Sequence, residues 1–250
     1  MPTAMNDVAV RIAGLAKRYG RQRVLAGVDL EVRSGEALGL VGANGAGKTT
    51  LIKCLLDLCS SDAGRVEIYG VPGTLAAARR RLAYVPERFT PPHYLRCGEF
   101  LELVLDLSGA RLERAKAERI LGELGLEPGV LDQPVRELSK GMTQKLGLAA
   151  CFLVERDLYV LDEPMSGLDP VSRVAVKSVM LRLNREAKTL FFSSHVLADV
   201  EELCSSIAVL DRGRIRFRGA PAELCARYSE PHLERAFMRC LRGDEPLQRA

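Results

Sequence analysis

The first fifty-eight residues carry two different apolar patterns. Residues 8–15 and 28–32 alternate apolar and polar side chains, which predicts antiparallel strands with one solvated face. Residues 37–41 are apolar on both faces and therefore predict a fully buried strand of a parallel sheet. A glycine-rich turn follows, and residues 48–58 have helical periodicity. These patterns predict a small antiparallel β-subdomain ahead of a larger α/β core.

Strand signals disappear between residue 86 and about residue 153. Three apolar stretches with helical spacing replace them, centred near Phe100, Ile120 and Leu146. We therefore expect a helical subdomain, about residues 88–153, inserted into the α/β core.

The last third of the chain returns to strand patterns. Residues 158–161, 189–193 and 207–210 predict further strands, and residues 211–213 predict a hairpin turn. Two short helices are expected to begin near Pro221 and Pro231. The expected fold class is α/β with a mainly parallel sheet, with a C-terminal helical tail over residues 221–250.

The composition fits a folded protein without a membrane span. With 250 residues, of which 47% are hydrophobic, the chain can bury a substantial core. Its longest apolar run, residues 146–154, is far shorter than the roughly 18 to 20 residues of a spanning helix. Residues 1–7 do not resemble a secretory signal, and the seven cysteines form no C-x-x-C pair. We therefore expect a cytosolic protein with reduced thiols.

Positive charge is concentrated near the C-terminus. The net charge is +4, and residues 212–250 hold nine arginines against five acidic residues. We interpret these arginines, and the run at residues 79–81, as solvated faces of helices and hairpins rather than as sites for anionic lipid or nucleic acid.

Residues 42–49, Gly-Ala-Asn-Gly-Ala-Gly-Lys-Thr, match the phosphate-binding pattern G-x-x-x-x-G-K-[ST] between a buried strand and a helix. Backbone N–H groups of such a loop surround phosphate oxygens, and the helix N-terminus adds about half a positive charge. Lys48 is expected on the β- and γ-phosphates, and Thr49 on Mg²⁺. The motif predicts a P-loop NTPase core. The candidate ATP-binding residues here are Gly42, Asn44, Gly45, Ala46, Gly47, Lys48, Thr49 and Thr50.

Two adjacent acidic residues, Asp162 and Glu163, end the predicted strand 158–161. A strand end of a parallel sheet can direct both side chains toward a neighbouring site. Because the chain also has a P-loop, Asp162 is expected to hold Mg²⁺ and Glu163 is expected to polarise the attacking water.

Four further stretches make the chain resemble a nucleotide-binding domain of the ATP-binding cassette (ABC) family. Residues 138–142, Leu-Ser-Lys-Gly-Met, resemble the LSGGQ signature, and residues 166–170, Ser-Gly-Leu-Asp-Pro, resemble the D-loop. His195 resembles the switch histidine, and Tyr19 falls where the family stacks an aromatic ring on adenine. The matches keep the family's order, and the resemblance implies an ABC ATP-binding domain over residues 8–220.

The resemblance implies roles for these residues. Tyr19 stacks on adenine, His195 contacts the γ-phosphate, and Asp169 couples two subunits. His195 thus joins Glu163 and Lys48 as a catalytic candidate. His93 and His232 match no family position, and we interpret them as structural or surface residues.

The resemblance also implies a composite site, in which the P-loop of one subunit and the signature of another close over the same ATP. Ser139 supplies a hydroxyl, Gly141 permits close backbone approach, and the helix that begins there adds its dipole. Ser139 is also expected to cap the helix that follows it, and this capping is compatible with a role at the partner's nucleotide.

Two departures from the family pattern are informative. Lys140 and Met142 replace a glycine and a glutamine of the signature, and Glu87 stands where the family commonly has the Q-loop glutamine. Both resemble the exporter branch with separate permeases, and Phe237 is similar to a residue of that branch's C-terminal helix. The candidate metal ligands are thus Thr49, Asp162 and Glu87.

The favoured function is an ATPase subunit that uses ATP and Mg²⁺ to power export through a separate transmembrane permease. A soluble ATPase acting on ribosomes or in DNA repair and an import motor are the alternatives. The chain has one cassette and no coiled-coil insertion, which argues against the soluble ATPase. Glu87 and Lys140 argue against the import motor. Expected partners are a second nucleotide-binding subunit, with a homodimer favoured, and an integral-membrane permease. No nucleic acid partner is expected. The expected location is the cytoplasmic face of the membrane.

Overall fold

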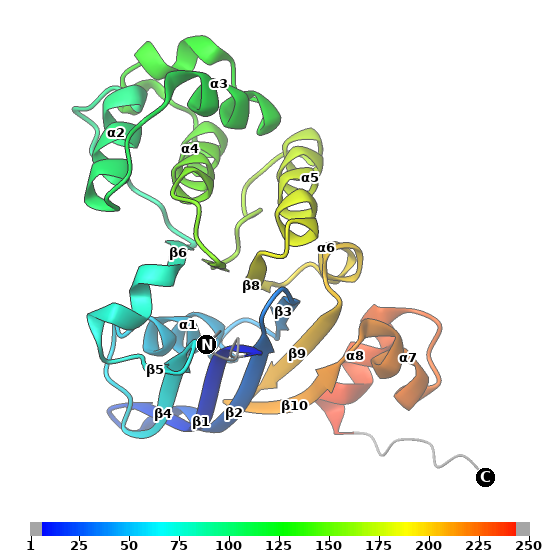
Figure 1. Ribbon diagram of the computed structural model, residues 1–250. Coiled ribbons are helices and arrows are strands. Elements are labelled where there is room, and N and C mark those ends of the chain that lie inside the picture. Colours follow the sequence, from blue (N-terminus) through cyan, green and yellow to red (C-terminus); the bar gives the residue numbers. More distant parts are fainter. Residues whose placement is uncertain (1–6, 244–250) are drawn as a thin grey trace, which may run out of the picture.

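A six-stranded sheet forms the centre of the computed structural model, which describes residues 7–243 (Figure 1). Its strand order is β10-β9-β3-β8-β7-β6, and every neighbouring pair is parallel except β9 with β10. The expected mainly parallel sheet is therefore confirmed. The strands are β3 (Ala37–Val41), β6 (Leu82–Val85), β7 (Leu158–Leu161), β8 (Thr189–Ser194), β9 (Ser206–Asp211) and β10 (Arg214–Gly219).

A second, antiparallel sheet has the order β2-β1-β4-β5. The predicted strands 8–15 and 28–32 are parts of longer ones, because both strands continue to the hairpin turn between them. The short strands β4 and β5 were not predicted, because only two residues of β4, Val66 and Ile68, form an apolar face and β5 has only two residues. The four strands are β1 (Val8–Tyr19), β2 (Gln22–Arg33), β4 (Ala63–Ile68) and β5 (Val71–Pro72).

Helices α2, α3 and α4 gather at one end of the molecule, away from the antiparallel sheet (Figure 1). They correspond to the three helical stretches predicted around Phe100, Ile120 and Leu146. The α-helices are α1 (Lys48–Leu55), α2 (Cys97–Leu107), α3 (Arg114–Glu123), α4 (Lys140–Leu153), α5 (Pro170–Arg185), α6 (Leu197–Leu203), α7 (Pro221–Tyr228) and α8 (Leu233–Arg242). Short 3-10 helices are η1 (Ala76–Arg81), η2 (Pro128–Asp132) and η3 (Val135–Glu137).

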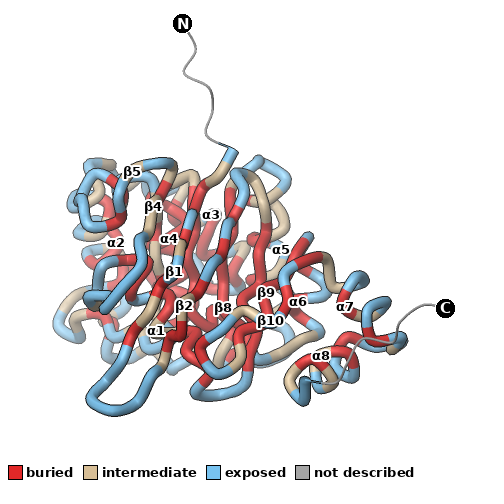
Figure 2. Tube along the Cα trace, turned by 90° about the horizontal axis from the view of Figure 1, so that it is seen from below, coloured by how far each residue is buried: buried red, intermediate tan, exposed pale blue. Residues whose placement is uncertain are grey.

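Buried residues lie on both faces of the parallel sheet (Figure 2). On one face, Leu51, Ile52 and Leu55 of α1 join the cluster formed with the antiparallel sheet. The other face packs against α4, α5 and the C-terminal helices. Burial of apolar area at roughly 25 cal/mol per Å² holds the two sheets and α1 together. The P-loop helix is thereby fixed on its apolar side.

Helix α1 is shorter than the sequence predicts. It ends at Leu55, whereas helical periodicity predicts an end at Leu58. Asp57 has a φ of 58°, in the left-handed region, which stops the helix. Leu58 is 61% exposed, so its apolar character does not report a buried helix face.

None of the helices between residues 7 and 243 combines the length and apolar character needed to cross a bilayer. The expectation that the chain has no secretory signal is based on residues 1–7. Residues 1–6 of this segment lie outside the described residues. Residues 244–250 of the predicted C-terminal tail also lie outside them.

Candidate active site

The loop between β3 and α1 is built for close backbone approach. Gly47 has a φ of 110° and begins α1 without a side-chain cap, which leaves the first amides of the helix free to bind an anion. A Cβ on Gly42 would lie 2.3 Å from the Leu210 carbonyl oxygen, so a larger residue cannot occupy this position. Lys48 Nζ donates to the Gly42 carbonyl oxygen at 2.8 Å, which folds the lysine over its own loop.

A cavity of about 550 Å³ lies beside this loop. It brings together residues that are distant in sequence, including Tyr19, Glu87, Glu163 and His195. Of the residues predicted from the P-loop motif, those that line it are Asn44, Gly45, Ala46, Gly47, Lys48, Thr49 and Thr50. Gly42, Asp162, Ser139 and Gly141 are not among the lining residues.

Ser193 joins the two acidic residues at the end of β7. Its hydroxyl donates to Asp162 Oδ1 at 2.6 Å and accepts from the Glu163 backbone N–H at 2.9 Å. Ser193 is fully buried at the end of β8, the neighbouring strand. Sequence reasoning missed this role, although a serine pair closing an otherwise apolar strand is a signal that could have found it.

Glu163 lies at the centre of a charged cluster. Its carboxylate is 3.7 Å from Lys48 Nζ through Oε1, and its Oε2 lies 2.8 Å from His195 Nδ1. Glu163 is 8% exposed and has a φ of 49°, an uncommon value for a residue with a side chain. Backbone strain of this kind persists where the surroundings over-determine it, often at active sites. His195 is the exposed member of the cluster.

The residues near Glu163 fit a bound Mg²⁺. Asp162 is 1% exposed, and its Oδ2 has no hydrogen-bond partner among the described residues. An unpartnered buried carboxylate oxygen costs free energy unless a cation or donor meets it. No group of three or more His, Cys, Asp or Glu side chains within residues 7–243 forms a metal cage. Mg²⁺ keeps waters and phosphate oxygens as most of its ligands, so a single buried carboxylate oxygen and a hydroxyl are a sufficient protein contribution.

Tyr19 lies at the rim of the cavity with half of its surface exposed. Lys17 Nζ lies 5.2 Å from the centre of its ring, in cation–π range. The Cys59 side chain is the main cause that raises the pKa of the Tyr19 hydroxyl, and a hydrogen bond from Thr50 opposes it. The ring therefore has a flat, accessible face beside the P-loop.

Ser139 and Gly141 lie at the N-terminus of α4, outside the cavity. The Ser139 hydroxyl accepts from the Met142 N–H at 3.2 Å, so it caps the helix, and the residue is exposed. In the same helix, Gln144 Nε2 donates to the Pro164 carbonyl oxygen at 3.2 Å. This bond ties the signature helix to the segment after Glu163, a contact that the sequence did not reveal.

Asp169 caps α5 through its carboxylate. It accepts from the Ser172 N–H at 3.0 Å and from the Ser172 hydroxyl at 2.6 Å, and these bonds hold the pKa of Asp169 below its ordinary value. The predicted D-loop is therefore anchored to the start of a helix.

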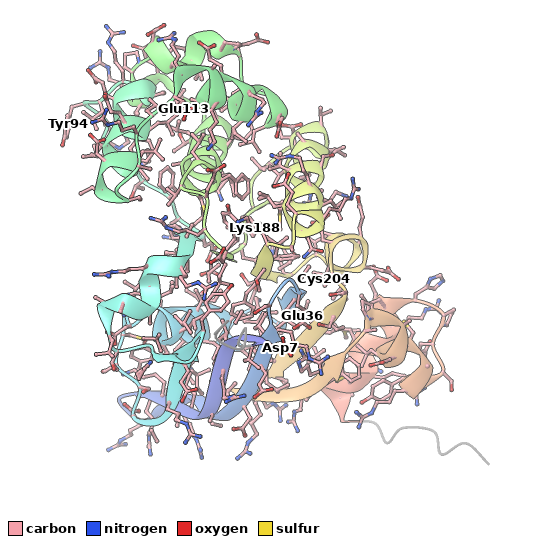
Figure 3. All side chains as sticks on the ribbon, viewed as in Figure 1. Asp7, Glu36, Tyr94, Glu113, Lys188 and Cys204 are labelled. Carbon is pink, nitrogen blue, oxygen red and sulfur yellow. The ribbon has the colours of Figure 1, made fainter. Side chains whose placement is uncertain are left out.

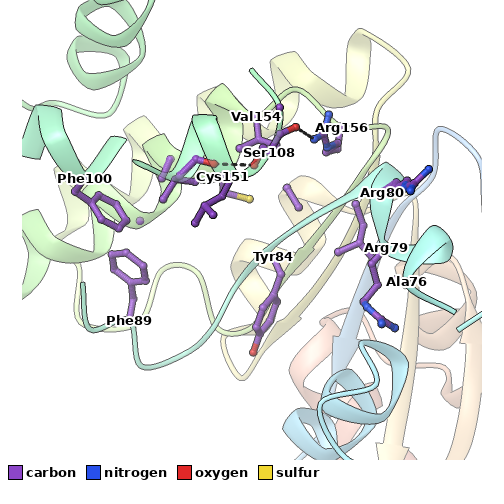
Figure 4. A pocket seen from close by; sticks show the side chains of 17 residues that line it. Ala76, Arg79, Arg80, Tyr84, Phe89, Phe100, Ser108, Cys151, Val154 and Arg156 are labelled. Atoms are coloured by element: carbon purple, nitrogen blue, oxygen red, sulfur yellow. Dashed lines mark hydrogen bonds between the residues drawn. The ribbon is translucent and has the colours of Figure 1, made fainter. Parts of the chain in front are cut away.

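A second cavity, of about 800 Å³, lies between β6 and the helices α2 and α4 (Figure 4). Phe89 and Phe100 meet edge to face in its wall, with ring centroids 5.6 Å apart. Arg79 and Arg80 line the opposite side. Burial, followed by the negative charge of Asp162, raises the pKa of the lining Tyr84 to about 12.

Comparison with known proteins finds a match to the family model described as "ABC transporter" over residues 25–166. An uncharacterized ABC transporter ATP-binding protein of Synechocystis is 38% identical over 204 residues, which is 79% of this chain and 56% of that protein. A Nod factor export ATP-binding protein I of Ralstonia nicotianae is 36% identical, and the match covers 85% of this chain and 67% of that protein. The chain spans 56% and 64% of the length of the first two relatives.

Solved structures agree with this match. The ATP-binding subunit of an ABC transporter has a TM-score of 0.84 and 31% identity, covering 93% of this chain and 99% of its own. A dimeric bacterial ABC transporter cassette, MJ0796, has a TM-score of 0.78 and 22% identity, covering 84% of this chain and 98% of its own. The expected P-loop fold is therefore confirmed.

Proposed function

Because this chain belongs to the ABC transporter family, we propose that it is the ATP-hydrolysing subunit of an exporter that acts through a separate permease. The observation that carries the proposal is the charged cluster of Lys48, Glu163 and His195 at the edge of the P-loop cavity. In this cluster Lys48 provides a cation that can bind phosphate, Glu163 provides a buried carboxylate that can accept a proton from water, and His195 is exposed to the cavity. The Nod factor export relative supports the direction of transport.

Binding of ATP follows from the P-loop and Tyr19. The free amides at the start of α1 receive the phosphate oxygens, and Lys48 turns from the Glu163 carboxylate toward the β- and γ-phosphates. Tyr19 stacks its exposed ring face on adenine. Lys48 thus exchanges one negative partner for another, so the buried ammonium group is never left without a counter-charge.

Thr49 and Asp162 would hold Mg²⁺, with Glu87 facing the same cavity. The ion would neutralise charge on the phosphate oxygens as hydrolysis proceeds. Ser193 fixes Asp162 through one carboxylate oxygen, so only the unpartnered Oδ2 is available to a ligand.

Hydrolysis depends on Glu163. Its carboxylate, released from Lys48 when ATP binds, accepts a proton from the attacking water. His195 orients that carboxylate through the contact at 2.8 Å and reaches the γ-phosphate from the exposed side. The backbone of Glu163 is held by Ser193, so the carboxylate keeps its direction during the reaction.

A second copy of the chain completes the site. Ser139 and Gly141 are exposed or half-exposed and lie outside their own chain's cavity, so they are free to cover the nucleotide of a partner. The dimeric cassette among the similar folds supports this arrangement. We propose that two copies bind two ATP molecules between them, with Asp169 coupling the subunits.

The second cavity is our candidate for permease contact. It is lined by aromatic and apolar side chains, and Leu107 at its edge is 81% exposed. Tyr94, 82% exposed, extends from the loop before α2 (Figure 3). This assignment puts the chain on the cytoplasmic face of the membrane.

Lys48→Ala tests the proposal. We expect loss of ATP binding and hydrolysis with little loss of folding, because a buried cation is removed from a preformed loop. Lys53→Ala is the matched control, since Lys53 is an exposed lysine of the same helix. Equilibrium binding of a fluorescent ATP analogue and phosphate release are the measurements. Unchanged hydrolysis by Lys48→Ala would refute the assignment of the site.

A further inference from the structure

Two thiols lie beside the nucleotide cavity and have no part in the roles above. Cys54 is in the last turn of α1, and Cys59 is in the irregular segment that follows. Their Sγ atoms are 3.3 Å apart. Cys54 is 7% exposed and Cys59 is half-buried, so the second thiol is the one that solvent reaches.

Tyr19 connects this thiol pair to the cavity. Lys17 Nζ lies 5.2 Å from the centre of its ring, and the Cys59 side chain is the main cause that raises the pKa of its hydroxyl. Lys17 is also 3.6 Å from Asp62 Oδ1, which fixes the cation. The half-exposed ring therefore has Lys17 at its face, and its hydroxyl is influenced by Cys59.

The segment that carries Cys59 can adjust to a shorter sulfur–sulfur distance. A disulfide requires about 2.05 Å between the sulfurs, so the pair must close by about 1.2 Å. Cys54 is fixed in the core of α1, but Cys59 follows a helix end where Asp57 is left-handed and Leu58 is 61% exposed. Movement is thus expected at Cys59, the residue that contacts Tyr19.

We propose that Cys54 and Cys59 form a modification site, at which a small-molecule disulfide oxidises the two thiols to an intramolecular disulfide and thereby weakens ATP binding through Tyr19. The coupling rests on the proposed function, because Tyr19 matters to ATP only if the cavity holds adenine. In a reducing compartment such a disulfide is transient, which is the behaviour of redox-sensing cysteines.

The chemistry requires one oxidant of the class RSSR. The Cys59 thiol loses its proton, its sulfur attacks one sulfur of RSSR, and RS⁻ leaves with the electron pair of the broken bond. Cys54 then loses its proton and attacks Cys59 Sγ, and the second RS⁻ leaves. Both released thiolates take up the two protons as RSH. The protein loses two electrons, and RSSR gains them.

The second step is limited by Cys54. Burial, followed by the hydrogen bond and charge of Cys59, raises the pKa of Cys54 to about 12. Cys59 no longer raises the pKa of Cys54 once its sulfur is in a mixed disulfide. The charge of Lys17 continues to favour the Cys54 thiolate. Closure should therefore accelerate as pH rises, in proportion to the thiolate fraction.

Closure draws Cys59 toward Cys54 and so changes the surroundings of the Tyr19 hydroxyl, whose pKa Cys59 influences, and we expect the ring to be less well held. A freer ring must be ordered again when adenine stacks on it, at about 0.5 to 1.5 kcal/mol for one immobilised side chain. We expect the Kd for ATP to rise about 2- to 10-fold on oxidation.

The test treats the full-length protein with glutathione disulfide and maps disulfides by mass spectrometry of unreduced peptides. Binding of a fluorescent ATP analogue is measured before oxidation, after it, and after reduction with dithiothreitol. Cys59→Ser removes the attacking thiol and should abolish the change in Kd, whereas Cys54→Ala should stop at a mixed disulfide of Cys59 with glutathione and form no intramolecular linkage. Cys225→Ser removes the other half-buried cysteine and should respond as the unmodified protein does.

A Cys54–Cys59 linkage together with a reversible rise in Kd supports the proposal. A map without that linkage under oxidant overturns the modification site, and a linkage with unchanged Kd overturns its coupling to ATP. If the reduced protein binds no nucleotide, the proposed function fails and the coupling fails with it, while the peptide map still decides whether the thiols pair.

Discussion

The P-loop cavity and the N-terminus of α4 differ in how much of a site one chain provides. In the cavity, Glu163 already contacts both Lys48 and His195, and the neighbouring Asp162 has one buried oxygen with no hydrogen-bond partner among residues 7–243. At α4, Ser139 is exposed and uses its hydroxyl to cap its own helix. The first region has charged side chains that already contact one another, and the second has an exposed helix N-terminus. Under the proposed function, one chain provides the groups for the chemistry and the exposed N-terminus of α4 serves a second chain.

Replacing Glu163 in the cavity should produce the largest change in the rate of ATP hydrolysis. Glu163→Gln keeps the shape and removes the carboxylate that accepts the proton, so hydrolysis should fall by about 10²- to 10⁴-fold. ATP binding should persist, because Lys48 no longer has to leave a carboxylate. Single-turnover phosphate release measures hydrolysis, and equilibrium binding of a fluorescent ATP analogue measures ATP binding. Glu186→Gln, an exposed residue just after α5, is the control. Hydrolysis within tenfold of the unmodified protein would mean that Glu163 is not the base.

Removing the Ser193 hydroxyl should have a smaller effect. Ser193→Ala leaves Asp162 Oδ1 and the Glu163 N–H without their shared partner, at a cost of about 1 to 3 kcal/mol in the free energy of unfolding. Misalignment of the carboxylates should lower hydrolysis by up to about 10²-fold. Denaturant unfolding and phosphate release test both effects, with the exposed Ser178→Ala as control. A fall in stability with unchanged hydrolysis would show that Ser193 is structural only.

The fold and the P-loop could be predicted because their signals are local. Residues 42–49 are contiguous, and β3 is apolar at every position. The end of α1 was missed because Asp57 adopts a left-handed conformation that apolar spacing does not encode. Strands β4 and β5 were missed because each is short: only Val66 and Ile68 alternate as apolar residues in β4, and β5 has two residues.

The candidate site was predictable residue by residue but not as a network. The motifs name Asp162, Glu163 and His195, but nothing in their spacing indicates that Ser193 joins the two acids. The contact of Gln144 with the Pro164 carbonyl depends on how α4 packs near β7 and is invisible to a motif. The Cys54–Cys59 contact was likewise missed, since the search for C-x-x-C pairs does not consider an i, i+5 pair across a helix end.

The mass of Glu163→Gln in solution tests the composite site most directly. With MgATP, light scattering should report two chains, and without nucleotide it should report one. Adding Ser139→Arg puts a bulky cation on the surface that must approach the partner's triphosphate, so the dimer should disappear while each chain still binds ATP. Ser178→Arg, the same change at an exposed serine of α5, should leave the dimer intact. If Ser139→Arg remains dimeric in MgATP, or if it abolishes ATP binding by the single chain, the signature does not act on a partner's nucleotide and the account is contradicted.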